Sequence, residues 1–155
     1  MTEPAKTVIG VIGSASPTDT GFETARQVGR LLAEYGAVIL CGGLSGVMEA
    51  ACKGAREGGG LSVGLLPGRD SGQANPYVTI PLPTGLGHTR NAVIARAASG
   101  LVAIEGGLGT VSEAALGLKM GKPVVGLDNA FSLPGLISVD SPQQAVDELR
   151  IRLNL

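Results

Sequence analysis

Short apolar stretches alternate with amphipathic segments along most of this chain. Runs of about four to eight apolar or β-branched residues between turn residues favour buried strands. Such runs occupy residues 7–12, 37–40, 61–66, 77–80, 101–104, 124–127 and 136–139. Between them, apolar residues recur three and four positions apart, which predicts amphipathic helices. The predicted helices cover residues 22–35, 47–55, 89–99, 111–118 and 142–153.

Strands that alternate with helices indicate parallel βαβ units with helices on both faces of the sheet. No linker or change in composition divides the 155 residues, so we expect one Rossmann-like domain over residues 1–155. The predicted fold class is α/β, with a doubly wound parallel sheet in a three-layer α/β/α sandwich. In such folds, ligands bind at the carboxyl ends of the strands, near the point where the strand order reverses.

The turn at residues 105–110, between a predicted strand and a predicted helix, is rich in glycine. It would place unpaired backbone N–H groups and the positive end of a helix dipole in one crevice, where phosphate is the natural occupant. Glycine has no Cβ atom, so the backbone can approach the anion closely. The Thr110 hydroxyl is expected either to cap the helix or to donate to the ligand. The candidate phosphate ligands here are Gly106, Gly107, Gly109 and Thr110.

Two further turns follow predicted strands, at residues 13–16 and 42–46. Packing of a helix on a strand explains one such turn as well as ligand binding does. Three turns at one edge of a sheet favour a shared binding crevice. None of them matches the dinucleotide fingerprint or the Walker A motif, so an ordinary dinucleotide or NTPase site is not expected. The candidate ligand residues of these two turns are Ser14, Gly42, Gly43, Ser45 and Gly46.

Arg90 and Glu113 are charged residues close to predicted helix starts. The helix dipole disfavours a cation at this position, so Arg90 indicates an anionic partner, or else a surface pair with a carboxylate. Glu113 follows the phosphate turn by one helical turn, where the dipole alone would favour a carboxylate. His88 suits a loop or capping position better than catalysis.

Composition excludes several classes of function. The formal net charge is −1 and no basic tract exists, so nucleic acid is not expected as a partner. One His with the separated Cys41 and Cys52 makes a metal site improbable, and we expect two buried thiols in a reducing compartment. No apolar run approaches about 20 residues and no leader segment is evident, so we expect a cytoplasmic protein without a membrane partner.

Three motifs resemble those of a Rossmann-like family long labelled "possible lysine decarboxylase". The family includes the cytokinin-activating nucleoside monophosphate phosphoribohydrolases, known as "lonely guy", and the molybdenum cofactor carrier proteins. Residues 13–16 resemble its Gly-Ser-Ser turn and residues 42–48 its Gly-Gly-x-x-Gly-Leu-Met element. Residues 105–113 resemble its Pro-Gly-Gly-x-Gly-Thr-x-Glu-Glu element. The likeness spans nearly the whole chain.

Departures from the hydrolase pattern favour the carrier branch of this family. Arg90 and Glu113 match the catalytic Arg and the second Glu of the hydrolases. However, the hydrolases have Pro, Glu and Lys at the positions of Glu105, Ser112 and Asn91. The Arg-Asn pair at residues 90–91 resembles the sequence of the carrier branch at this point. A decarboxylase is not expected, because nothing marks a pyridoxal phosphate site with its Schiff-base lysine.

The resemblance therefore implies a binding or carrier protein for a phosphorylated heterocycle. Its ligand would be a nucleotide or the pterin of molybdenum cofactor, with no other cofactor required. The alternatives are a nucleoside monophosphate phosphoribohydrolase that uses Arg90 and Glu113, and a structural scaffold with vestigial turns. The family also implies a homodimer or homotetramer. The Ala-rich helices at residues 47–55 and 92–98 would allow close helix packing, either between subunits or within one.

Overall fold

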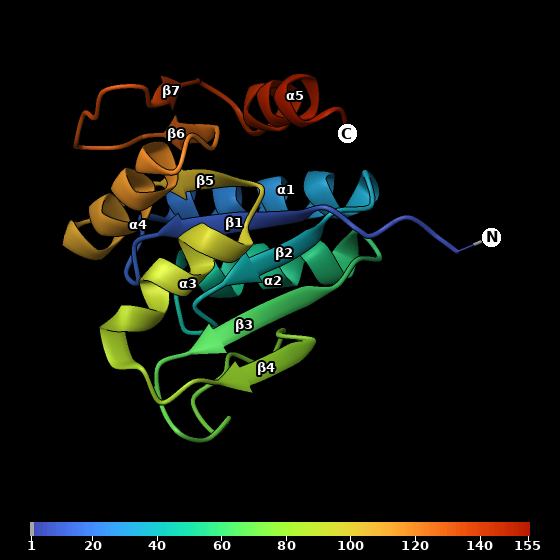
Figure 1. The fold of residues 1–155 in the computed structure, drawn as a ribbon, viewed down its shortest axis with the longest axis vertical. Helices are drawn as coiled ribbons and strands as arrows, with labels where there is room; N and C mark the ends of the chain where they lie inside the picture. The colour runs from blue at the N-terminus through green and yellow to red at the C-terminus, as the bar shows by residue number, and fades with distance from the viewer. Residues whose placement is uncertain (1) are drawn as a thin grey trace.

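A seven-stranded sheet lies between two helical layers in the computed structural model, which describes residues 2–155 (Figure 1). The strands are β1 (Val8–Gly13), β2 (Val38–Cys41), β3 (Ser62–Leu66), β4 (Ile80–Pro83), β5 (Gly100–Ile104), β6 (Val124–Leu127) and β7 (Ile137–Ser138). The helices are α1 (Asp19–Glu34), α2 (Val47–Glu57), α3 (Arg90–Ala97), α4 (Leu108–Lys119) and α5 (Pro142–Leu153), with a 3-10 turn η1 (Gly87–Thr89) before α3.

The strand order is β4-β3-β2-β1-β5-β6-β7, and every neighbouring pair is parallel. β1 lies at the centre, paired with β2 on one side and β5 on the other. The chain builds outward from β1 in one direction and then returns to build outward in the other. The strand order therefore reverses between β1 and β5, where a crevice opens at the carboxyl ends of the strands.

Two aliphatic cores fill the space between the sheet and its helical layers. α1, α2 and α5 cover one face, and α3 and α4 cover the other (Figure 1). Successive side chains of a strand point to opposite faces, so Val11 of β1 enters the first core and Ile12 enters the second. The α/β fold class and its three layers, predicted from the sequence, are thus confirmed. None of the helices in residues 2–155 has the length and apolar character needed to cross a membrane.

Small residues bring α1 and α2 close together. A Cβ atom at Gly29 of α1 would lie 2.9 Å from the carbonyl carbon of Ala51, and one at Gly54 of α2 would lie 2.8 Å from the carbonyl carbon of Arg26. The Ala-rich face predicted at residues 47–55 therefore packs on α1 within the same chain. This contact accounts for the alanines of α2 without a second subunit.

β4 departs from the prediction, which placed this strand at residues 77–80. The strand begins at Ile80 and includes Pro81 and Pro83. Proline is tolerated there because β4 is an edge strand, and an edge strand has unpaired positions where a missing N–H costs nothing. The preceding segment is held by side chains, because Ser62 and Thr79 exchange two hydrogen bonds of 3.1 Å between backbone N–H and hydroxyl groups.

Candidate functional site

A cavity of about 270 Å³ opens at the carboxyl ends of β1 and β2, next to the start of α4. It lies where the strand order reverses, as expected for this fold. Its wall also includes the first residues of α3 and His88 of η1. Seven of the residues proposed from the sequence line it: Ser14, Gly42, Arg90, Gly107, Gly109, Thr110 and Glu113.

The N-terminus of α4 is open to this cavity. Its N-cap residue is Gly107, and no side chain caps the helix. The first helical hydrogen bond runs from the Val111 N–H to the Gly107 carbonyl, at 3.0 Å. The N–H groups of Leu108, Gly109 and Thr110 precede it and have no helical acceptor. They are donors at the positive end of the helix dipole, and such a position suits an anion.

The glycines of this turn have different surroundings. A Cβ atom at Gly107 would meet nothing within 4 Å, and one at Gly109 would meet only the Asn91 amide nitrogen, at 3.9 Å. Gly106 has a φ of 102°, and a Cβ atom there would lie 2.5 Å from the Cβ atom of Thr110. Gly106 therefore shapes the turn and lines an adjoining hollow instead of the main cavity. Thr110 is buried in the first turn and does not cap the helix, and its side chain lines the cavity.

The turn before α2 is closed by protein contacts. The Val47 N–H donates to the Ser14 carbonyl at 2.9 Å, and the Ser45 hydroxyl donates to the Ala15 carbonyl at 3.4 Å. Gly46 has a φ of 74°, and a Cβ atom there would lie 2.5 Å from the Ala15 carbonyl group. Ser45 and Gly46 thus hold the turn at residues 13–16 and lie outside the cavity wall. Packing explains this part of the motif.

Gly42 and Gly43 also pack closely. A Cβ atom at Gly42 would lie 2.5 Å from Nη2 of Arg90, and one at Gly43 would lie 2.7 Å from the Leu66 side chain. The Gly43 carbonyl accepts the Asn75 N–H at 2.9 Å, and the Asn75 amide donates to the Leu44 carbonyl at 2.9 Å. Asn75 thereby fastens the loop between β3 and β4 to this turn. Nothing in the local pattern around Asn75 singles it out for that role.

Arg90 is buried and its guanidinium is bonded to protein atoms. Its Nε donates to the Leu65 carbonyl at 2.9 Å, and its Nη1 donates to Oδ1 of Asn91. Desolvation lowers the pKa of Arg90. No carboxylate lies within ion-pair distance of Arg90 among the described residues, so the interpretation of Arg90 as half of a surface pair is wrong.

Asn91 is a candidate that the sequence showed only as a departure from the hydrolase pattern. It is buried and lines the cavity. Because Oδ1 accepts from Arg90, its Nδ2 group is turned toward Gly109 at the start of α4. No acceptor for Nδ2 is found in residues 2–155, so this donor faces the same space as the helix N–H groups.

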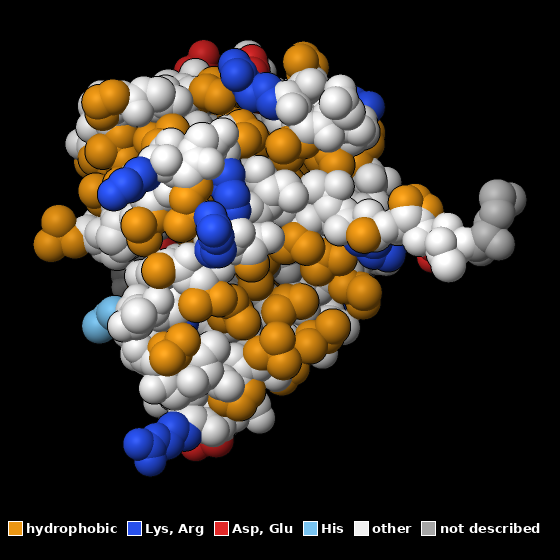
Figure 2. Space-filling view, viewed as in Figure 1, with side chains coloured by type: hydrophobic (Ala, Val, Ile, Leu, Met, Phe, Trp, Pro, Cys, Tyr) orange, Lys and Arg blue, Asp and Glu red, His pale blue; other side chains and the backbone are white. Residues whose placement is uncertain are grey.

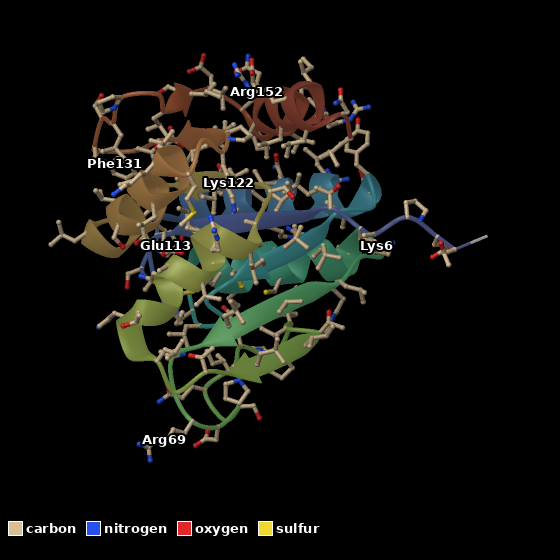
Figure 3. The ribbon with its side chains drawn as sticks, viewed as in Figure 1. Lys6, Arg69, Glu113, Lys122, Phe131 and Arg152 are labelled. Carbon is tan, nitrogen blue, oxygen red and sulfur yellow. The ribbon has the colours of Figure 1, made fainter. Side chains whose placement is uncertain are left out.

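Glu113 lies on α4 and faces the α3 side of the cavity (Figure 3). It is 8% exposed. Desolvation raises the pKa of its carboxyl group to about 7, against the opposing effect of the Arg90 charge. Within residues 2–155 its carboxylate has no hydrogen bond or ion pair, and it does not contact Arg90 directly. The dipole alone, which was considered from the sequence, does not account for this burial.

Glu105 joins the phosphate turn to the start of α1. Its carboxylate accepts from the Thr18 N–H at 3.0 Å and from the Thr18 hydroxyl at 3.1 Å. Thr18 is the N-cap of α1. Glu105 has a φ of 51°, an uncommon conformation for a residue with a side chain. Beside it, a hollow that shares Ser14 and Gly107 with the main cavity is bordered by Asp128.

Two other polar groups have structural roles. Lys122 donates to the Ala95 carbonyl at 2.7 Å and so satisfies the end of α3 (Figure 3). Cys41 and Cys52 are buried free thiols with Sγ atoms 3.5 Å apart. The described part of the chain contains no group of three or more side chains suited to hold a metal ion.

Comparisons with known proteins agree with this geometry. The sequence profile of the SLOG cluster4 family matches residues 6–150. An uncharacterized protein of Archaeoglobus fulgidus is 41% identical over 139 residues, which cover 90% of this chain and 91% of that protein. The molybdenum cofactor binding protein from the phototrophic bacterium Rippkaea orientalis has a similar structure, with a TM-score of 0.91, 34% identity and coverage of 97% of this chain and 99% of that one. The molybdenum cofactor carrier protein from Chlamydomonas reinhardtii has a TM-score of 0.85, 33% identity and coverage of 97% and 100%. The resemblance drawn from the sequence motifs is confirmed.

Proposed function

Because the chain belongs to the SLOG cluster4 family and is similar to molybdenum cofactor carrier proteins over nearly its whole length, we propose that it binds and carries a phosphorylated heterocycle. The ligand is a nucleotide or the pterin of molybdenum cofactor. In this proposal the protein requires no further cofactor and acts in the cytoplasm.

The observation that carries this proposal is the open start of α4. Within residues 2–155 its first-turn N–H groups have no acceptor, and the Nδ2 group of Asn91 is turned toward them. A helix N-terminus with a second, buried donor beside it suits the terminal phosphate of a ligand. Gly107 and Gly109 leave room for the phosphate to approach the backbone.

The cavity has room for the phosphate and part of a ligand. Its volume of about 270 Å³ is at the low end of the range for small-molecule sites. The adjoining hollow shares Ser14 and Gly107 with it and has a volume of about 380 Å³. The phosphate would occupy the end near α4, and the heterocycle would extend along the shared wall.

Isothermal titration calorimetry with AMP and with molybdopterin tests this function. In Gly107→Val the added side chain covers the N–H groups of α4, so we expect at least about a hundredfold loss of affinity with the fold intact. Gly68→Val is the matched control, because a Cβ atom at Gly68 also meets nothing within 4 Å and Gly68 lies outside the cavity. Unchanged affinity in folded Gly107→Val would show that the turn is only structural.

Hydrolysis of a nucleoside monophosphate is the second candidate. Glu113 favours it, because a buried carboxyl group with a pKa of about 7 suits acid–base catalysis near neutral pH. Against it, the Arg90 guanidinium is bonded to Leu65 and Asn91, and the Ser112 hydroxyl donates to the Gly109 carbonyl of its own helix. We expect slow or absent release of free base from AMP. Turnover at about 1 s⁻¹, lost in both Arg90→Ala and Glu113→Ala, would favour the enzyme instead.

A homodimer or homotetramer is also part of the proposal. Apolar side chains gather over β3 and β4 on the face that Figure 2 shows. Ile80 and Leu82 of β4 are exposed, and so are Val93 of α3 and Leu86 of the segment before it. Sedimentation at micromolar concentration measures the state directly, and a species of 15.5 kDa would contradict an oligomer.

A further inference from the structure

Glu113 conflicts with the anion site beside it. Glu113 lies on α4 shortly after the open first turn, and side chains of a helix lean toward its N-terminus. Glu113 and this first turn line the same cavity. An ionised Glu113 would repel a phosphate dianion held by these N–H groups, and burial makes such repulsion stronger than it is in water.

The neighbouring groups offset this negative charge only in part, because desolvation affects the pKa of Glu113 more than the Arg90 charge does. From α3, Arg90 is the facing cation, but its Nε and Nη1 are bonded to Leu65 and Asn91, and it forms no ion pair with Glu113 in the described chain. From η1, His88 borders the cavity and is exposed. The wall contributed by β1 and α2 has no titratable side chain, and the Cys41 thiol of β2 is buried behind Gly42.

We propose that the site binds its phosphate together with one proton, which is shared between the Glu113 carboxyl group and a phosphate oxygen. This inference rests on the proposed function and concerns the regulation of the same site. Where Glu113 is ionised, the empty site takes up one phosphate monoester dianion and one proton from the buffered solution, and the complex holds that proton between the carboxyl group and a phosphate oxygen. The carboxylic acid then donates a hydrogen bond to the phosphate, so the repulsion becomes an attraction, and no covalent bond changes.

Loading is therefore coupled to pH. Desolvation already raises the pKa of the Glu113 carboxyl group to about 7, so the acid form exists in the empty site at neutral pH. Above about pH 7, each bound ligand takes up one proton, and the affinity decreases about tenfold per pH unit. A carrier built this way holds its ligand more tightly in a slightly acidic environment and releases it as the pH rises.

The test is calorimetric titration with AMP and molybdopterin between about pH 7 and pH 9, in two buffers with different heats of ionisation. For the natural chain we expect the Kd to rise about tenfold per pH unit, with about one proton taken up per ligand near the upper end. Glu113→Gln keeps the shape but cannot ionise, so its Kd should be nearly constant over this range. Glu148→Gln, the same change on the distant helix α5, should keep the slope.

Two results would overturn this inference while the proposed function survives. One is a Kd for the natural chain that does not change with pH, with no proton uptake. The other is a slope that persists in Glu113→Gln. If neither probe binds at any pH, the proposed function fails, and this inference fails with it.

Discussion

The starts of α2 and α4 have similar sequences, but their backbone N–H groups have different partners. Each follows a buried strand and a glycine-rich turn, and each has a glycine N-cap without a side-chain hydrogen bond. At α2, the Val47 N–H is bonded to Ser14, and the turn is covered by Ala15 and fastened by Asn75. At α4, the first donors face a cavity. A glycine turn therefore predicts a backbone geometry, and the surrounding chain decides whether that geometry serves packing or a ligand.

The turn at residues 13–16 creates this difference. It lies between the two helix starts and uses the Ser14 carbonyl to satisfy α2. Toward α4 it contributes only part of a cavity wall. Glu105 binds Thr18 and so anchors the start of α1 beside the phosphate turn. The protein thereby satisfies the first N–H group of α2, whereas the first N–H groups of α4 have no acceptor within residues 2–155.

Valine at Gly46 is expected to have the largest effect on stability. The φ of 74° disfavours any side chain, and the Cβ atom would lie 2.5 Å from backbone atoms of Ala15. We expect Gly46→Val to reduce the free energy of unfolding by at least about 3 kcal/mol. Gly107→Val should change it by less than about 1 kcal/mol, because that position is open. Urea unfolding compares the two, and equal losses would remove the distinction between a closed and an open turn.

Glutamine at Glu113 should stabilise the protein at alkaline pH. The folded state raises the pKa of this carboxyl group from 4.5 to about 7, so its contribution to stability is complete below about pH 4.5 and is lost as the pH rises through about 7. Glutamine stays neutral throughout. We expect Glu113→Gln to be more stable than the natural chain by up to about 3 kcal/mol near pH 8 and nearly equal to it near pH 4. Unfolding at both pH values measures this, and a constant difference would contradict the assignment to Glu113.

Two asparagines provide a matched pair with smaller effects. Asn75→Ala leaves the Leu44 carbonyl without its donor on the closed side, so we expect a loss of about 1–2 kcal/mol in stability and unchanged ligand affinity. Asn91→Ala removes a donor on the open side, so we expect about a tenfold weaker Kd for AMP. Thermal unfolding and calorimetry on both variants give the comparison. An affinity loss in Asn75→Ala would show that the closed turn also binds ligand.

Hydrophobic spacing alone predicted most of the fold. The period of three to four residues located the helices, and the short apolar runs located the strands, because burial of one face determines both patterns. Capping residues add to this pattern at the C-terminal helix, where Ser141 accepts the Gln144 N–H and Pro142 begins the helix. β4 was displaced in the prediction, because two prolines are permitted only by its place at the edge of the sheet.

The sequence by itself determined the turns, the strands that precede them and the residue types available for an anion. Only the tertiary structure decided which turn stayed open. The contacts responsible join distant parts of the chain, such as Thr18 with Glu105, 87 residues apart, and Asn75 with Leu44, 31 residues apart. Local spacing determines which donors a helix start offers. Whether protein or ligand satisfies them depends on contacts that form only when the chain has folded.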